Sequence, residues 1–171
     1  MARHRGPVLL DTNVIIECWR IGAWRALAGG YELETAEACE AEALTGMQRR
    51  PPEQQVDAAV LRQTLNAVHA VGRAELARAL IRDQQLGFLD EGEQALWAHA
   101  LTRQDDWLLC GPDKASLRLG IRLGLRERLV ALERLLDDVG YRPKQKLRDA
   151  YTQRWQVRTL AELAQQEEGP S

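Results

Sequence analysis

Four acidic residues stand at positions where a carboxylate could take part in metal chemistry. They are Asp11, Glu42, Glu93 and Asp113. Asp11 follows the apolar run PVLL, Glu93 lies in the first turn of a predicted helix, and Asp113 follows the run WLLC and a Gly-Pro pair. Carboxylates that gather closely repel one another unless a cation neutralises them. Hard oxygen ligands favour Mg²⁺ or Mn²⁺, which can orient a water molecule and stabilise charge on a phosphoryl group.

Each acid also has a structural interpretation, which the sequence alone leaves open. Asp11 could cap the helix that follows its strand. Asp90 and Glu93 have the spacing of a capping box, and Asp113 could form a turn after Gly-Pro. Glu42 is one of five glutamates in a short stretch, most of which must be ordinary helix-surface charges. No acid decides the question by itself, so their order and placement have to be considered together.

Short apolar segments alternate along the chain with segments of helical periodicity. The predicted strands are residues 7–11, 31–35, 67–71 and 106–110, with 127–132 as one more candidate. The predicted helices are 35–46, 53–68, 72–85, 89–104, 114–124 and 133–140, of which 89–104 is the clearest. An earlier helical unit ends at Gly29-Gly30. The alternation predicts an α/β fold of three layers, in which a short parallel sheet carries helices on both faces. Because ligands bind beyond the carboxyl ends of such strands, we expect Asp11 to face a ligand crevice.

Composition and charge describe an ordinary globular chain. The 171 residues are 45% apolar and 28% charged, and no apolar run has the length of a membrane span. The basic N-terminus has too short an apolar stretch for a signal peptide, so we expect a cytoplasmic protein. The net charge of −2 argues against binding nucleic acid by bulk electrostatics. It does not exclude a nuclease, because a cluster of acids at a site lowers the net charge.

The cysteines bear on whether the chain has a zinc site, and one basic stretch bears on whether it has a surface that contacts phosphates. Cys18, Cys39 and Cys110 form no CxxC pair and have apolar neighbours, so we expect three reduced core residues and no zinc site. The stretch RLGIRLGLRER, residues 118–128, is locally rich in arginine. We interpret it as a solvated helix face and a loop in preference to a surface that contacts phosphates.

Four motifs in order make the chain resemble the PIN domain family, small metal-dependent ribonucleases that include the toxins of many bacterial toxin–antitoxin pairs. LLDTNVII resembles the family's opening strand and its Asp-Thr/Ser-Asn motif. EALTG has a Glu followed four residues later by Gly, and DEGEQALWAHAL has a Gly-Glu pair that opens a central helix with alanines behind it. WLLCGPDKAS places an Asp after a strand and a short turn. The similarity extends from about residue 8 to about residue 139.

The resemblance implies a PIN-like three-layer α/β/α fold and a metal-dependent endoribonuclease that hydrolyses RNA phosphodiester bonds. Asp11, Glu93 and Asp113 would be the main ligands of Mg²⁺ or Mn²⁺, directly or through water. Glu42 would hold a second metal ion or orient the attacking water. All four acids would therefore be catalytic residues and metal ligands.

The resemblance also implies neighbours and partners for these acids. Thr12 and Asn13 would shape the site by donating a hydrogen bond to a ligand or a phosphate oxygen, although either could instead cap a helix. The implied partners are an RNA substrate, an antitoxin protein and a second copy of the chain in a homodimer, without a membrane. The chain would divide into a PIN-like nuclease domain, residues 1–140, and a helical, partly disordered extension, residues 141–171. The polar composition of residues 165–171 predicts that they are disordered.

Two departures from the family pattern leave choices open. The turn before the last acid is more often Thr-Asn or Thr-Asp in the family, whereas here Gly-Pro precedes Asp113. Glu40 competes with Glu42 for the second position, and Glu37 is a more distant option. Glu40 and Glu42 lie about 200° apart around a helix, so both cannot face one site. Gly46, four residues after Glu42, favours Glu42.

The three histidines receive no metal role from the sequence. His4 lies near the terminus, and His69 is interpreted as a core or edge residue of the segment AVHAV. His99 lies about 240° around its helix from Glu93, so we expect it to face away from the metal. Two other functions are weighed against the nuclease. One is a catalytically inactive PIN-like module that binds RNA or protein, and the other is a phosphotransfer enzyme with Asp11 as acceptor, although DTN lacks the second Asp of a DxD motif.

Overall fold

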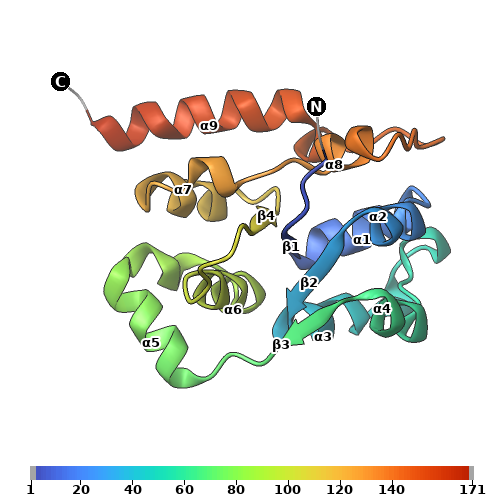
Figure 1. Cartoon of the computed structure of the whole chain (residues 1–171), viewed down its shortest axis with the longest axis horizontal. Helices are drawn as coiled ribbons and strands as arrows, with labels where there is room; N and C mark the ends of the chain where they lie inside the picture. Colours follow the sequence, from blue (N-terminus) through green and yellow to red (C-terminus); the bar gives the residue numbers. More distant parts are fainter. Residues whose placement is uncertain (1–2, 170–171) are drawn as a thin grey trace.

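The centre of the fold is a four-stranded parallel sheet with the strand order β3-β2-β1-β4 (Figure 1). The computed structural model describes residues 3–169. The strands are β1 (Pro7–Leu10), β2 (Glu32–Ala36), β3 (Ala67–His69) and β4 (Leu108–Cys110). The predicted α/β class and parallel sheet are therefore confirmed, and the arrangement is consistent with three layers.

Helices connect the strands and continue after the last one. They are α1 (Thr12–Arg20), α2 (Trp24–Gly30), α3 (Glu37–Leu44), α4 (Ala58–Thr64), α5 (Arg73–Arg82), α6 (Glu91–Ala100), α7 (Lys114–Arg122), α8 (Leu132–Asp138) and α9 (Gln153–Glu168). The helical unit expected to end at Gly29-Gly30 is in fact two helices. The chain turns at Gly22, whose φ of 69° is a conformation that glycine adopts without strain. Asp11, and neither Thr12 nor Asn13, occupies the N-cap position of α1.

Alternate residues of β1 enter two hydrophobic cores, one on each face of the sheet. Val8 and Leu10 belong to a core with α1, α2 and α8, whereas Leu9 belongs to a core with α6, α7 and α9. All three side chains are fully buried. A strand that is buried on both faces needs apolar residues at every position, which explains the uninterrupted run PVLL.

The three cysteines lie in the hydrophobic cores, as the sequence predicts. Cys18 and Cys110 belong to the core that contains Val8, and Cys39 belongs to the core on the opposite face. All three are buried and free, as expected. Within residues 3–169, no helix combines the length and the apolar character that crossing a membrane requires.

The additional strand predicted at residues 127–132 does not form. The chain makes a 3₁₀ turn at Arg126–Arg128 and then a single isolated bridge between Leu109 and Leu129. The apolar pattern of this stretch arises because it passes from one core to the other. Leu129 is buried with α6 and α7, whereas Leu132 is buried with α1 and α2.

The C-terminal segment ends in the long helix α9, which packs along α7 (Figure 1). Buried leucines of α9 join the core that contains α6 and α7. Near its end, Glu167 pairs with Arg118 at 3.0 Å and with Arg122 at 2.9 Å. The disorder expected from residue 165 onward is therefore wrong as far as Glu168, because these ion pairs hold the last turn of the helix. Residues 170–171, also expected to be disordered, lie outside the described residues.

The order of the strands creates a switch point beside β1. The chain passes from β1 to β2 and β3 on one side and then returns to place β4 on the other side of β1. Asp11 follows β1, and Gly111 follows β4. The amide of Asp11 donates to the carbonyl oxygen of Cys110 at 3.0 Å, which keeps the ends of the two strands together. In open α/β sheets, this is the position at which ligands bind.

Candidate functional site

Asp11 is a buried carboxylate at the switch point. It is 3% exposed, and among the described residues its Oδ2 atom has no hydrogen-bond partner. Asp11 occupies the N-cap position of α1, but its side chain makes no capping hydrogen bond of standard geometry. Gly111 leaves room for it, because a Cβ on Gly111 would lie 3.1 Å from the Cβ of Asp11. One oxygen of this carboxylate is therefore buried without a hydrogen-bond partner, which costs free energy.

Glu42 approaches from α3 and is held by two donors from other elements. The hydroxyl of Thr12 donates to Oε2 at 3.0 Å, and the amide of Gly92 donates to Oε1 at 3.1 Å. A Cβ on Gly92 would lie 2.8 Å from Oε2, so the glycine permits this approach. Glu40 points elsewhere, with its Oε1 3.7 Å from Nε of Arg62. The choice of Glu42 over Glu40 agrees with this geometry.

Glu93 and Asp113 lie at the N-termini of α6 and α7, and both take part in helix capping. Asp90 and Glu93 form the expected capping box, in which the amide of Glu93 donates to Oδ1 of Asp90 at 2.9 Å. The amide of Asp90 donates to Oε2 of Glu93 at 3.4 Å. Asp113 Oδ1 accepts from the amide of Ser116 at 3.0 Å. Each capping contact uses a single oxygen, so it is compatible with a second role for the carboxylate.

The pKa values of two acids show that the group shares one electrostatic environment. Burial, with the charges of Asp90 and Glu42, raises the pKa of Asp11 to about 7. Burial, with the charges of Asp11, Asp113 and Asp90, raises the pKa of Glu93 to about 8. The amides of Thr12 and Asn13 oppose the shift of Asp11 without cancelling it. Both carboxylates are thus unfavourable in their charged form when no cation is near.

The four acids are nevertheless spread more widely than the ligands of a bound ion. Among residues 3–169, the group of three whose ligand atoms all lie within 4.8 Å of one another is Glu34, His69 and His99, and it includes none of the four acids. The donor chemistry of the acids suits a hard divalent cation, since every donor is a carboxylate oxygen. The unpartnered Oδ2 of Asp11 supplies a free ligand atom for such an ion.

Thr12 and Asn13 differ in their surroundings. Thr12 is 7% exposed, and its hydroxyl contacts Glu42 and also the carbonyl oxygen of Cys39 at 3.2 Å. It therefore positions Glu42. Asn13 is exposed, and its backbone carbonyl accepts from the hydroxyl of Tyr151 at 3.3 Å.

Two arginines of the basic stretch are engaged within the molecule. Arg118 pairs with Glu167, and Arg122 pairs with both Glu167 and Asp83. These contacts join α7 to α9 and to the turn before α6. They agree with the interpretation of this stretch as a helix surface in preference to a surface for phosphates.

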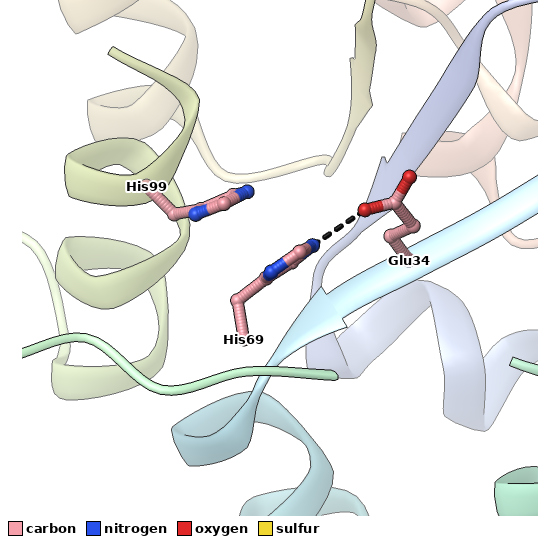
Figure 2. Close-up of side chains that lie close together, drawn as sticks. All are labelled: Glu34, His69 and His99. Carbon is pink, nitrogen blue, oxygen red and sulfur yellow. Dashed lines mark hydrogen bonds and ion pairs between the residues drawn. The ribbon is translucent and has the colours of Figure 1, made fainter. Parts of the chain in front are cut away.

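The cluster of Glu34, His69 and His99 was not found by the sequence reasoning (Figure 2). His69 lies at the end of an edge strand, as expected, and Glu34 was grouped with the helix-surface glutamates. The ring of His99 stacks on that of His69, with the ring centroids 3.7 Å apart. The one signal for Glu34 is its place in the alternating segment YELETA, where Leu33 and Thr35 share the opposite face. This cluster could hold a metal ion.

No protein-family model, no curated protein and no solved structure matches the chain.

Proposed function

We propose that the chain is a Mg²⁺- or Mn²⁺-dependent endoribonuclease of the PIN type. The observation that carries the proposal is the buried, unpartnered Oδ2 of Asp11 beside the charges of Glu42, Asp90 and Glu93. A buried carboxylate oxygen without a partner costs free energy, and a divalent cation at this point would remove that cost. The position of Asp11 at the switch point of the sheet supports a ligand site in the same place.

In this proposal, Asp11, Glu93 and Asp113 hold the cation. When bound, the ion would orient and acidify a water molecule and would offset the charge that develops on the scissile phosphate. Glu42 is fixed by the hydroxyl of Thr12 and the amide of Gly92. Its remaining lone pairs can accept a hydrogen bond from the attacking water, so Glu42 would set the direction of attack. No nucleophilic side chain is required.

The biological setting is a further part of the same proposal. RNA as substrate, an antitoxin as protein partner, a homodimer and a cytoplasmic location all rest on the resemblance to PIN domains. The buried acids themselves support a phosphodiester substrate of either sugar type. The assay below therefore uses RNA first and the matching DNA sequence as a comparison.

A second function is favoured by a different observation. Glu93 and Asp113 each make capping hydrogen bonds, and no three of the four acids bring their oxygens as close together as the ligand atoms of Glu34, His69 and His99. These contacts suit an inactive PIN-like module, in which the acids stabilise helix termini while the molecule binds RNA or protein. Such a module would bind RNA without cleaving it.

The deciding experiment is a cleavage assay on a mixture of tRNA, rRNA and mRNA with Mn²⁺, with and without a chelator. It compares wild type and Asp11→Asn with the matched pair Glu42→Gln and Glu40→Gln, which alter neighbouring glutamates of one helix. We expect chelator-sensitive cleavage that falls by about a hundredfold in Asp11→Asn and Glu42→Gln. Glu40→Gln should cleave as wild type does. Binding of RNA without cleavage by wild type would favour the inactive module, and equal cleavage by all four proteins would contradict the proposed site.

A further inference from the structure

A second group of side chains converges on one point beside the sheet, outside the acid cluster (Figure 2). Oε1 of Glu34 lies 2.5 Å from Nε2 of His69. The rings of His69 and His99 are stacked, with centroids 3.7 Å apart and planes inclined by 14°. The ligand atoms of the three residues all lie within 4.8 Å of one another. Two imidazoles and a carboxylate thus share one small volume.

Regular secondary structure holds each of these side chains in place. Glu34 lies on β2 and His69 on the adjacent strand β3, and the strand register pairs Ala36 with His69. Because Glu34 and Ala36 are two residues apart on one strand, Glu34 and His69 share a face of the sheet. His99 comes from α6, which packs on β2. Sites on strands and helices keep their geometry better than sites on loops.

We propose that Glu34, His69 and His99 bind one transition-metal ion of the Zn²⁺ class. Two histidines and a glutamate are a recurring ligand set for Zn²⁺ and leave a fourth position for water. Around a tetrahedral ion with bonds of about 2.0–2.1 Å, ligand atoms lie roughly 3.4 Å apart, so small side-chain rotations would suffice. The expectation of no zinc site considered the cysteines, and this site uses none of them.

Arg103 already places a positive charge among the three ligand atoms. Its Nη1 atom lies 2.8 Å from Oε1 of Glu34, 3.0 Å from Nε2 of His99 and 3.4 Å from Nε2 of His69. Arginine can only donate, so Nε2 of His99 is the unprotonated nitrogen that a metal ion requires. The space therefore accommodates a cation, and Arg103 is the competitor of the metal.

Arg103 has a second partner that can retain it when the metal ion enters. Its Nε and Nη2 atoms lie 2.9 Å and 2.5 Å from the carboxylate of Asp105. The side chain of Asp105 is 44% exposed, so the guanidinium can turn toward solvent while it stays paired. Metal affinity is then set by competition between the ion and Nη1. Removal of the guanidinium charge should tighten metal binding.

The site would join three elements of the fold. Coordination would link β2, the edge strand β3 and α6, so it should raise the stability of the folded chain in proportion to metal concentration. None of the four acids of the proposed nuclease site takes part. The proposal therefore stands or falls separately from RNA cleavage.

The test is a Co²⁺ titration of the full chain followed by visible absorption, with millimolar Mg²⁺ present to occupy the carboxylate site. Tetrahedral Co²⁺ bound by nitrogen and oxygen absorbs far more strongly than octahedral Co²⁺, so the spectrum separates the two kinds of site. We expect one tetrahedral Co²⁺ per wild-type chain, displaced by one equivalent of Zn²⁺. Affinity should fall at least about tenfold in His69→Ala and His99→Ala and rise at least about tenfold in Arg103→Met.

Matched variants control for general effects of substitution. His4→Ala removes the remaining histidine, and Arg122→Met removes an ion-paired arginine elsewhere, so both should retain wild-type affinity. Asp11→Asn should also retain the tetrahedral spectrum. If a histidine variant fails to fold, the comparison of Arg103→Met with Arg122→Met still tests the proposal. Absence of a tetrahedral spectrum from wild type at millimolar Co²⁺, or equal affinity in Arg103→Met and wild type, would overturn it.

Discussion

The hydroxyl of Thr12 donates a hydrogen bond to Oε2 of Glu42 at 3.0 Å, which joins the first residue of α1 to α3 across 30 positions of sequence. The same hydroxyl lies 3.2 Å from the carbonyl oxygen of Cys39, so two acceptors share its one proton. Thr12 follows Asp11 directly. This contact therefore fixes the position of one candidate site acid relative to another.

Loss of the Thr12 hydroxyl should release Glu42. Thr12→Val keeps the shape of the side chain but removes the donor, and we expect RNA cleavage to fall roughly tenfold. Thr12→Ser keeps the hydroxyl and should stay close to wild type. Single-turnover cleavage rates would measure both variants, and equal rates for Val and Ser would show that the hydrogen bond does not position Glu42 for catalysis.

Gly92 should be intolerant of a side chain, because a Cβ there would lie 2.8 Å from Oε2 and 3.0 Å from Oε1 of Glu42. Gly92→Ala should displace Glu42 and lower cleavage by about tenfold or more while α6 remains folded. Gly29→Ala is the matched control, because a Cβ on this helical glycine meets nothing within 4 Å. Circular dichroism and cleavage rates would be compared for both. Full activity in Gly92→Ala would show that the position of Glu42 does not matter for RNA cleavage.

The folded chain should become less stable as pH rises when no divalent cation is present. Burial and neighbouring acids raise the pKa of Asp11 from 3.8 to about 7, so the folded state holds a proton more tightly than the unfolded state does. The contribution of this proton to the free energy of unfolding is complete below the unfolded pKa of Asp11. It is lost as pH rises through the folded pKa, between about pH 4 and pH 7.

Asp11→Asn should remove the loss of stability that wild type shows as pH rises. We expect it to raise the free energy of unfolding at pH 8 by roughly 2–4 kcal/mol relative to wild type, and to have little effect at pH 4. Urea denaturation in chelator at the two pH values would measure this difference. Asp149→Asn, at a side chain that is 79% exposed, is the control and should change neither value. If Asp11→Asn is instead less stable than wild type at pH 8, the carboxylate of Asp11 stabilises the metal-free fold, and the prediction is contradicted.

Glu17 should show the opposite dependence on pH. Burial by itself raises its pKa, but hydrogen bonds from Arg20 at 2.6 Å and from the amide of Arg148 at 2.9 Å outweigh burial and lower it. Its contribution is therefore present above the unfolded pKa and is lost as pH falls through the folded value, below about pH 4.5. Glu17→Gln should cost about 2–3 kcal/mol at pH 7, with the difference shrinking toward pH 3. Urea denaturation measures it, with the exposed Glu37→Gln as control, and a constant difference at all pH values would contradict the assignment.

The sequence predicted those features of the fold that depend on local pattern. Uninterrupted apolar runs identified β1 and β4, and the break after Leu10 marked Asp11 as a strand-end acid. Gly46 favoured Glu42 for a family reason, whereas the structure shows a physical one in the donors from Thr12 and Gly92. Residues 127–132 misled the prediction, because an apolar stretch that crosses between two cores looks like a strand.

The histidine cluster could not be predicted in this way. Glu34, His69 and His99 are brought together by the register of β2 on β3 and by the face that α6 presents to the sheet. The local sequence around the three residues predicts neither the strand register nor the face of α6 that packs on the sheet. The helical angle between Glu93 and His99 predicts that His99 faces away from the acids, but it could not show that His99 would lie beside Glu34 and His69.

The central claim is that the carboxylates around Asp11 hold a divalent cation, and calorimetric titration of the chain with Mn²⁺ tests it most directly. We predict saturable binding by wild type, weakened at least about tenfold in Asp11→Asn and unchanged in His99→Ala. Binding of equal strength by wild type and Asp11→Asn, or no binding by wild type at millimolar Mn²⁺, would contradict it.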